Sequence, residues 1–447
     1  MDIGVVGAGF TGLQLACYLS KAGHRVDIFE RESQPGGLAT YMDYGGFYWD
    51  RFYHVILPSD LHLIRFLQDL GLRDEIIWRE SRTGFFVDDN LYSMSNNRDF
   101  LFFPPLSLWS KFRLAVTILY ASILKNSTPL EQITAENWLK KVGGEKTYEK
   151  FWKPLLTAKL GKNFHRVSAV FIWTYIKRLY SARDAVASRE KLGHVRGGYK
   201  TVLDKIENIL ISCGTELHYN SQVDHIGAEQ DQLFIHSDGR KNNYDRVVFT
   251  APTTIMSQVV SPELVNVRQP DRQVEYLGVI CPVLVTNEPL VPYYVVNIAD
   301  ARVPFTGIIG MSSVVDPNET GGYYTTYLPK YVHSGSDEFD KPDEVITDEF
   351  LEGVKIIFPE FQKKSIRSIH VNRARFVQPL QVTGYSQLIP EVNTKHPHFY
   401  VLNSSQFTDN TLNNNTVSKH VRQFLRDHAD CFNLADDSAI LAESKRK

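Results

Sequence analysis

The opening residues constrain the fold more than any other part of the chain. Asp2–Val6 is a short apolar stretch that predicts a β-strand, and Gly7, Gly9 and Gly12 follow it with GxGxxG spacing. The first glycine permits a tight turn, the second lets the backbone approach a pyrophosphate, and the third lets the next helix pack closely on the strand. An apolar stripe with helical spacing comes next, so this segment predicts a strand–turn–helix unit that binds a dinucleotide at the helix N-terminus.

A second strand and an acidic residue complete this unit. Arg25–Phe29 predicts the strand, and Glu30 follows it, 18 residues after Gly12. A carboxylate at about this distance typically hydrogen-bonds the ribose hydroxyls of the dinucleotide. We expect Phe10 and Thr11 in the turn, and Arg31 beside the acid, to lie at the same ligand.

A second pair of glycines, Gly36 and Gly37, follows closely in "SQPGGL". Glycine has no Cβ, so the backbone here can come close to a second anionic or polyhydroxyl part of the ligand. An enzyme that binds only a nicotinamide dinucleotide has no need of this pair, whereas FAD has a ribityl-pyrophosphate stem to hold. We therefore expect both glycines and Leu38 to contact FAD; an ordinary turn is the alternative.

Two stretches carry a family resemblance. "VVGAGFTGLQLACYLSKAGHRVDIFERESQPGG" resembles the FAD-binding signature of the flavin amine oxidase, protoporphyrinogen oxidase and phytoene desaturase superfamily. "LATYMDYGGFYWDRFYHVI" is similar to a bacterial branch that includes hydroxysqualene oxidoreductase-like proteins. The resemblance covers most of the chain in patches. It implies an α/β fold, with a discontinuous, glutathione-reductase-like Rossmann FAD-binding domain and an inserted α+β substrate domain.

The resemblance also implies a division of the chain. We expect FAD-binding segments at 1–80, 191–255 and 386–440, and substrate-domain segments at 81–190 (helical) and 256–385 (containing a sheet).

Later flavin contacts are carried over from the same resemblance. In the second FAD segment it places Gly197 and Gly198, before an amphipathic helix, and Val223, in a strand, beside the cofactor. In the third it places Asn403 and Gln406 after a strand and Asn415 at the start of a helix. The usual Arg-Gly pair is replaced by "LN" at 412–413, so detailed contacts there depart from the pattern.

Composition excludes several functions. Forty-nine basic and 51 acidic residues give a net charge of −2, which does not support nucleic-acid binding. The four cysteines form no CxxC pair and the fourteen histidines show no metal-ligand spacing, so we expect no metal.

The first strand begins at Asp2, and we expect a cytoplasmic protein with no signal peptide. The apolar helix around Phe112–Leu124 predicts either a core helix, the favoured interpretation, or a peripheral contact with a membrane.

Catalytic residues are less clear than cofactor contacts. Tyr53 and His54 belong to "DRFYH", which matches the bacterial branch, although a buried polar cluster is an equal alternative. Lys159 lies where relatives often have a basic residue, and Arg375 lies on a strand expected to approach the flavin.

We therefore predict an FAD-dependent oxidoreductase that dehydrogenates, desaturates or reduces a hydrophobic small molecule, isoprenoid in character, or an amine. A non-redox, flavin-dependent isomerase resembling UDP-galactopyranose mutase is the alternative, and a flavin-binding protein with weak chemistry is a third hypothesis. No second GxGxxG unit is present for a separate nicotinamide domain. The sequence does not specify the substrate, the electron acceptor or the oligomeric state.

Overall fold

The nucleotide-binding unit is built around a five-stranded sheet. In the structure, a computed structural model that describes residues 1–181, 190–266, 273–408 and 411–434, its strands run in the order β20-β13-β1-β2-β9, and all neighbours are parallel. The strands are β1 (Asp2–Val6), β2 (Arg25–Phe29), β9 (Glu216–His218), β13 (Arg246–Phe249) and β20 (Phe399–Val401). The strand before the glycine turn thus lies in the middle of a parallel sheet, and the predicted Rossmann-type α/β class is confirmed.

The two faces of this sheet are covered differently. Val5 of β1 packs into a core with the helices, whereas its neighbour Val6 packs into a second core with an antiparallel sheet, because successive strand residues point to opposite faces. The helices of the first face are α1 (Phe10–Lys21), α2 (Leu61–Asp69), α10 (Gly198–Ser212) and α13 (Asn414–Asp427). The second face is covered by β10 (Val223–Glu229), β11 (Gln232–Ser237), β12 (Arg240–Tyr244) and the short helix α11 (Thr253–Val259).

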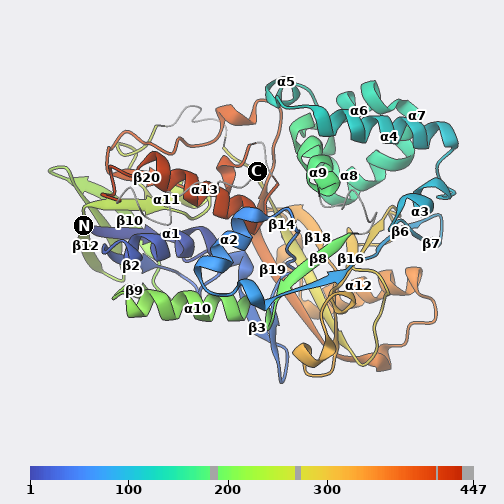
Figure 1. The fold of residues 1–447 in the computed structure, drawn as a ribbon, viewed down its shortest axis with the longest axis horizontal. Helices are drawn as coiled ribbons and strands as arrows, with labels where there is room; N and C mark the ends of the chain where they lie inside the picture. Colours follow the sequence, from blue (N-terminus) through green and yellow to red (C-terminus); the bar gives the residue numbers. More distant parts are fainter. Residues whose placement is uncertain (182–189, 267–272, 409–410, 435–447) are drawn as a thin grey trace.

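A larger, mainly antiparallel sheet forms the second half of the molecule (Figure 1). Its strands are β6 (Thr83–Val87), β7 (Asn90–Ser93), β14 (Tyr276–Thr286), β15 (Val295–Ile298), β16 (Gly307–Gly310), β17 (Tyr324–Tyr327), β18 (Lys330–His333) and β19 (Ile366–Pro379). The long strand β14 is buried along its whole length and pairs with β17, β18 and β19, while α12 (Asp343–Ile357) packs against β14 and β19.

Helices form a separate cap on this sheet, at the upper right of Figure 1. They are α3 (Asn97–Leu101), α4 (Leu108–Ile123), α5 (Thr128–Glu131), α6 (Ala135–Gly143), α7 (Glu145–Thr147), α8 (Lys153–Leu160) and α9 (Ala169–Ser181). A π-helical turn at Tyr148–Trp152 leads into α8. None of the helices in the part of the chain that the structure describes has the length and apolar character needed to cross a membrane.

Two small sheets lie where the halves meet. They are formed by β3 (Tyr41–Asp43) with β4 (Tyr48–Asp50), and by β5 (Ile76–Glu80) with β8 (Lys191–Val195).

Three strands differ from expectation, β6, β7 and β12. The segment 81–190, predicted to be helical, begins with β6 and β7, which join the large sheet because "TGFFV" and "NLYS" can pair across a two-residue Asp88-Asp89 turn at positive φ. The strand β12 was not predicted at all.

Candidate flavin site and active site

The first glycine turn has one tightly packed position and one open position. A Cβ on Gly12 would lie 2.0 Å from the carbonyl oxygen of Gly7, and Gly7 itself has a φ of +103°. Gly9, in contrast, has nothing within 4 Å of the position of a Cβ, and its φ of −67° is open to any residue. Gly9 thus leaves a backbone cradle at the N-terminus of α1, which is the feature that a pyrophosphate requires.

Glu30 and the second glycine pair hold this turn in place. Glu30 Oε2 accepts the N–H of Ala8 at 2.8 Å, and the N–H of Gly36 donates to the Ala8 carbonyl at 2.8 Å. Gly36 and Gly37 both have positive φ, and a Cβ on Gly37 would lie 3.1 Å from the Cα of Gly9. The Gly36 N–H is therefore used within the protein rather than kept for a ligand, and the pair packs on the first glycine turn. Exposed Gly37 extends the same cradle.

The start of β10 lies beside the acidic residue. The N–H of Ser221 donates to the Glu30 carbonyl at 2.8 Å, and that of Asn220 to the Glu32 carbonyl at 3.0 Å. The chain just before buried Val223 therefore lies next to Glu30, where the ribose is expected. Arg31 is exposed and pairs with Glu32 at 3.1 Å.

The remaining predicted flavin contacts of the first FAD-binding segment differ in burial. Phe10 is buried against the rings of Phe66 and Tyr199, whereas Thr11 and Leu38 are half-buried.

The second glycine-rich segment is anchored by two acids from elsewhere in the chain. Asp50 Oδ1 accepts the N–H of Tyr199 at 2.7 Å, and Glu319 Oε2 accepts the N–H of Gly197 at 2.9 Å. Gly197 and Gly198 have φ of +75° and +70°. The start of α10 is thus capped by a residue of β4 and tied to the large sheet by Glu319.

Polar residues of the third segment are committed to protein contacts. Asn403 and Gln406 form a reciprocal capping box, in which the N–H of Asn403 donates to Gln406 Oε1 at 3.0 Å. Asn415 Oδ1 accepts the N–H groups of His62 and Leu63 at 2.9 and 3.1 Å, so it caps α2. A direct flavin contact by each of these side chains stays a prediction.

Two of the four catalytic candidates come together. The hydroxyl of Tyr53 lies 3.0 Å from that of Tyr331 on β18. Lys159 Nζ on α8 lies 4.2 Å from the ring centre of Tyr175 on α9 and 5.1 Å from that of Tyr331. We call these four residues the Lys159 cluster. No sequence signal singled out Tyr175 or Tyr331, because single tyrosines in an aromatic-rich chain carry no pattern.

The protonation of this cluster follows from its surroundings. Burial acts to lower the pKa of Lys159, but the neighbouring phenols of Tyr175 and Tyr331 outweigh it and the pKa is raised. Burial raises the pKa of Tyr53 well above its ordinary value, and it raises that of Tyr331 as well. At neutral pH the cluster therefore presents the Lys159 ammonium group and the neutral phenols of Tyr53 and Tyr331.

The other two candidates lie elsewhere. His54 Nδ1 is 2.9 Å from the Phe52 carbonyl, and its ring packs against Tyr199 with centres 4.9 Å apart. Arg375 is exposed and bonds Asp340 at 2.6 Å and the Ser334 carbonyl at 3.1 Å. Neither contact joins them to the Lys159 cluster.

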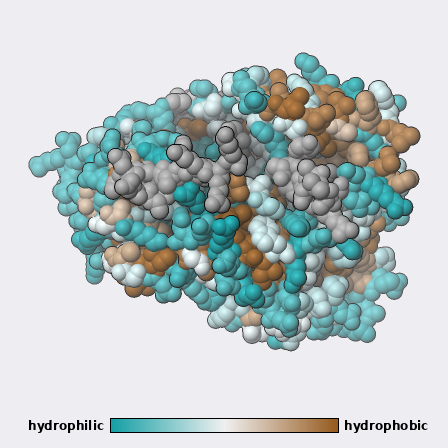
Figure 2. Space-filling view, in the orientation of Figure 1, coloured by the Kyte–Doolittle hydropathy of each residue, from teal (hydrophilic) through white to brown (hydrophobic). Residues whose placement is uncertain are grey.

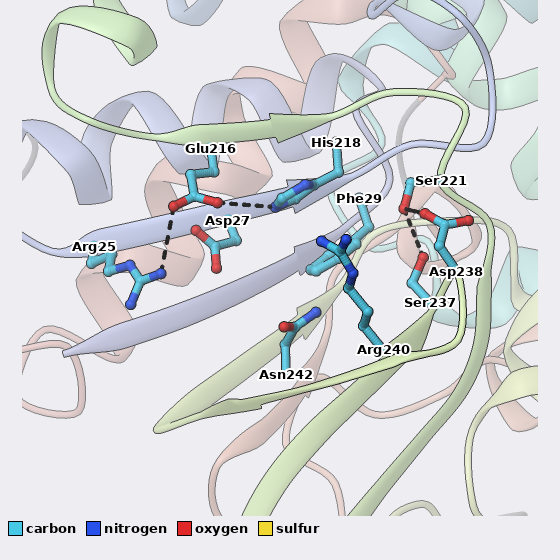
Figure 3. A pocket seen from close by; sticks show the side chains of 10 residues that line it. All are labelled: Arg25, Asp27, Phe29, Glu216, His218, Ser221, Ser237, Asp238, Arg240 and Asn242. Carbon is cyan, nitrogen blue, oxygen red and sulfur yellow. Dashed lines mark hydrogen bonds and ion pairs between the residues drawn. The ribbon is translucent and has the colours of Figure 1, made fainter.

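A polar pocket of about 380 Å³ lies at the edge of the nucleotide-binding unit (Figure 3). Asp27, Glu216 and His218 each direct one potential ligand atom into a space where these atoms are within 4.8 Å of one another. Arg25, 3.5 Å from Glu216 Oε1, already supplies positive charge there, and the His218 ring stacks on Phe29. Sequence reasoning missed this triad because β2 and β9 bring it together across almost 200 residues.

The parallel sheet, the open glycine cradle and the acid beside it define a dinucleotide-binding protein of the Rossmann type. The chain belongs to the flavin containing amine oxidoreductase family, whose model matches residues 10–401. This membership confirms the predicted superfamily and the flavin cofactor. The open Gly9 cradle and Glu30 fit the nucleotide half of FAD.

Individual proteins resemble the chain more weakly. It is 22% identical to the 15-cis-phytoene desaturase of Glycine max over 283 residues, 57% of this chain and 48% of the desaturase. It is 26% identical to the zeta-carotene desaturase of Synechocystis sp. over 251 residues, 51% of this chain and 50% of that protein. The matches thus span about half the length of these relatives.

Among solved structures, an oxidoreductase from Methanosarcina mazei is 22% identical, with a TM-score of 0.73, and the match covers 95% of this chain and 100% of that one. Reduced UDP-galactopyranose mutase is 16% identical, also with a TM-score of 0.73, over 99% and 97% of the chains. Because both structures match this chain with the same TM-score, the fold alone does not distinguish an oxidoreductase from an isomerase.

Proposed function

We propose that this protein is an FAD-dependent oxidoreductase whose substrate is a hydrophobic small molecule positioned at the Lys159 cluster. The observation that carries the proposal is the meeting of Tyr53, from the first flavin segment, with Lys159 and Tyr331, from the two expected substrate segments. A site assembled from all three parts is where a cofactor held by one domain would face a substrate held by the other.

FAD, when bound, supplies the acceptance of a hydride equivalent from a C–H bond. The cofactor would be held by the glycine turn, Glu30, the second glycine pair and the residues carried over from the resemblance. The proposed set is Gly7, Gly9, Phe10, Thr11, Gly12, Glu30, Arg31, Gly36, Gly37, Leu38, Gly197, Gly198, Val223, Asn403, Gln406 and Asn415.

The Lys159 cluster would orient the substrate rather than remove a proton. The Lys159 ammonium and the phenols of Tyr53 and Tyr331 hold their protons at neutral pH, so each can donate a hydrogen bond, and the tyrosines can also present an aromatic face. Such groups suit a substrate that loses a hydride from carbon and needs no strong base. The aromatic surroundings favour an apolar molecule, and an amine would have to bind beside a positive charge.

The domain division supports this arrangement. We propose that residues 1–80, 191–255 and 386–440 form a glutathione-reductase-like flavin domain, and that 81–190 and 256–385 form the inserted substrate domain. The parallel sheet takes its strands from the first group, and the antiparallel sheet takes its strands from the second.

Substitution of Lys159 tests the proposal. We expect Lys159→Met to retain FAD but to slow flavin reduction by an apolar polyene or prenyl donor about 100-fold, because a positioning group is lost. Lys177→Met is the matched control: Lys177 Nζ lies over the ring of Trp173 on the same α9 helix, at 4.3 Å, outside the cluster. Stopped-flow bleaching of the flavin absorbance under anaerobic conditions gives both rates.

The outcomes separate the hypotheses. Equal rates in both variants would remove the Lys159 cluster from the site. Turnover of UDP-galactopyranose by the pre-reduced protein, with no net oxidation, would replace the oxidoreductase with the isomerase alternative.

A further inference from the structure

The helical cap carries a large exposed apolar surface. Its members lie on α3, on α4 and directly after α3, and each is between 40% and 74% exposed: Leu101, Phe102, Leu108, Trp109, Phe112, Val116, Leu119, Tyr120 and Ile123. We call this set the α4 surface. Figure 2 shows a hydrophobic area in the same upper right region where Figure 1 labels α4, α6 and α7.

Most of this surface is the second apolar side of α4. Leu114, Thr117 and Ala121 point inward, where α4 packs against α6 and α9. Trp109 and Phe112 point outward and stack on each other with ring centres 5.5 Å apart. The core interpretation of this helix is therefore correct for only one side. Folding gains nothing from exposing these rings to water, so a surface of this size indicates an interaction partner.

The charges around the surface favour one kind of partner. No acidic residue occurs between Asp99 and Glu131. Arg98 and Lys125 are exposed at the two ends of the α3–α4 segment. Lys111 is buried, and its Nζ donates to the Leu101 carbonyl at 2.6 Å, which fixes the α3–α4 corner. An apolar helix face with basic ends and an exposed tryptophan is complementary to the interface of an anionic lipid bilayer.

We propose that the α4 surface docks the protein peripherally on an anionic lipid bilayer, with α4 lying in the plane of the interface. The helix packs on α9, an element of the proposed active site: Trp173 Nε1 on α9 donates to the Ala121 carbonyl on α4 at 2.9 Å. The same α9 helix carries Tyr175 of the Lys159 cluster. Docking thus places one helix layer between the bilayer and that cluster, a short route for an apolar substrate. Only this last point rests on the proposed function.

Vesicle binding tests the proposal on the full-length flavoprotein. The test measures co-sedimentation of the protein, without any substrate, with vesicles of phosphatidylcholine that contain or lack phosphatidylglycerol. We expect binding to anionic vesicles, a blue shift of Trp109 fluorescence, and a partition coefficient about tenfold or more lower for the double variant Leu108→Glu/Phe112→Glu. The matched control is Ile211→Glu, because Ile211 is 63% exposed but lies on α10. Arg98→Ala/Lys125→Ala should lose only the preference for anionic lipid.

Three results would overturn docking. One is equal vesicle binding by the α4 variant and the Ile211 control. Another is absence of vesicle binding by the wild type. The third is a concentration-dependent dimer, seen by sedimentation, that Leu108→Glu/Phe112→Glu dissociates, since the surface would then join two copies. Unchanged melting temperature and flavin content show that the variants are folded. Activity on a detergent-dispersed donor is scored separately, so loss of docking and loss of the proposed function remain distinguishable.

Discussion

Gly9 and Gly12 are both glycines of one motif, yet the structure gives them different reasons to be glycine. We expect Gly12→Ala to destabilise even the cofactor-free protein by about 3 kcal/mol, because its Cβ would meet the Gly7 carbonyl. Gly9→Ala should lower that stability by about 1 kcal/mol or less, since its Cβ meets nothing and alanine is only a poorer N-cap than glycine. It should still lower FAD affinity about tenfold or more, because the methyl group would fill the phosphate cradle. Urea unfolding of the apo-protein and flavin titration measure the two effects; unchanged FAD affinity in Gly9→Ala would place the pyrophosphate elsewhere.

At the same scale, local motifs were predictable and long-range partners were not. Gly7, Glu30 and Gly36 could be assigned because their spacing within forty residues reflects one turn and one strand end. The cap that Asn415 provides to α2 spans more than 350 residues, and nothing in its surroundings reveals it. Tyr331 was missed for the same reason, since its partner Tyr53 comes from another part of the chain.

Among the elements, α10 depends on a cap from another strand. Asp50 is 2% exposed and accepts the N–H of Tyr199 in the first turn of α10. We expect Asp50→Ala to lower the free energy of unfolding by about 2–3 kcal/mol, because the substitution removes a helix cap and leaves the buried N–H of Tyr199 without its acceptor. Asp204→Ala removes only the Lys200 pair on the same helix and should cost less than about 0.5 kcal/mol. Urea unfolding compares them, and equal losses would contradict a capping role for Asp50.

Element prediction worked where apolar periodicity was strong. The strand–helix pairs β1–α1 and β20–α13 follow clear patterns, and the structure places α13 within one residue of its expected start. The strand β12 is "RKNNY", four polar residues and a tyrosine, so it has no apolar alternation and exists because it pairs with β11. For α4 the sequence shows two apolar sides. Which of them is buried depends on the helices that pack against α4, and the sequence does not specify those contacts.

For the molecule as a whole, one buried and four partly buried histidines make stability depend on pH. Burial is the first cause that lowers the pKa in each member of this set: His24, His62, His370, His396 and His398. In the unfolded chain these groups take up protons near their ordinary pKa of about 6.5, before the folded protein does. The unfolded state therefore binds more protons below that pH, and stability is lost as the pH falls.

We accordingly expect the melting temperature to fall between pH 7.5 and about 5.5. The melting temperature of His62→Gln should fall less steeply with pH. The reason is that burial and the nearby charges of Lys419 and Arg422 all lower the pKa of His62. A scan of melting temperature against pH for both proteins measures this, and parallel curves would exclude His62 from the effect.

The strand order of the parallel sheet has a consequence for synthesis. Strand β1 leaves the ribosome first, but its neighbour β13 begins at Arg246 and the edge strand β20 ends at Val401. During translation the nascent β1–α1–β2 unit must therefore wait, with an edge of β1 unpaired, until β13 has been made, and β13 in turn waits about 150 more residues for β20. A strand that waits so long is a natural binding site for a chaperone, and premature termination before residue 399 would leave a sheet with no complete core.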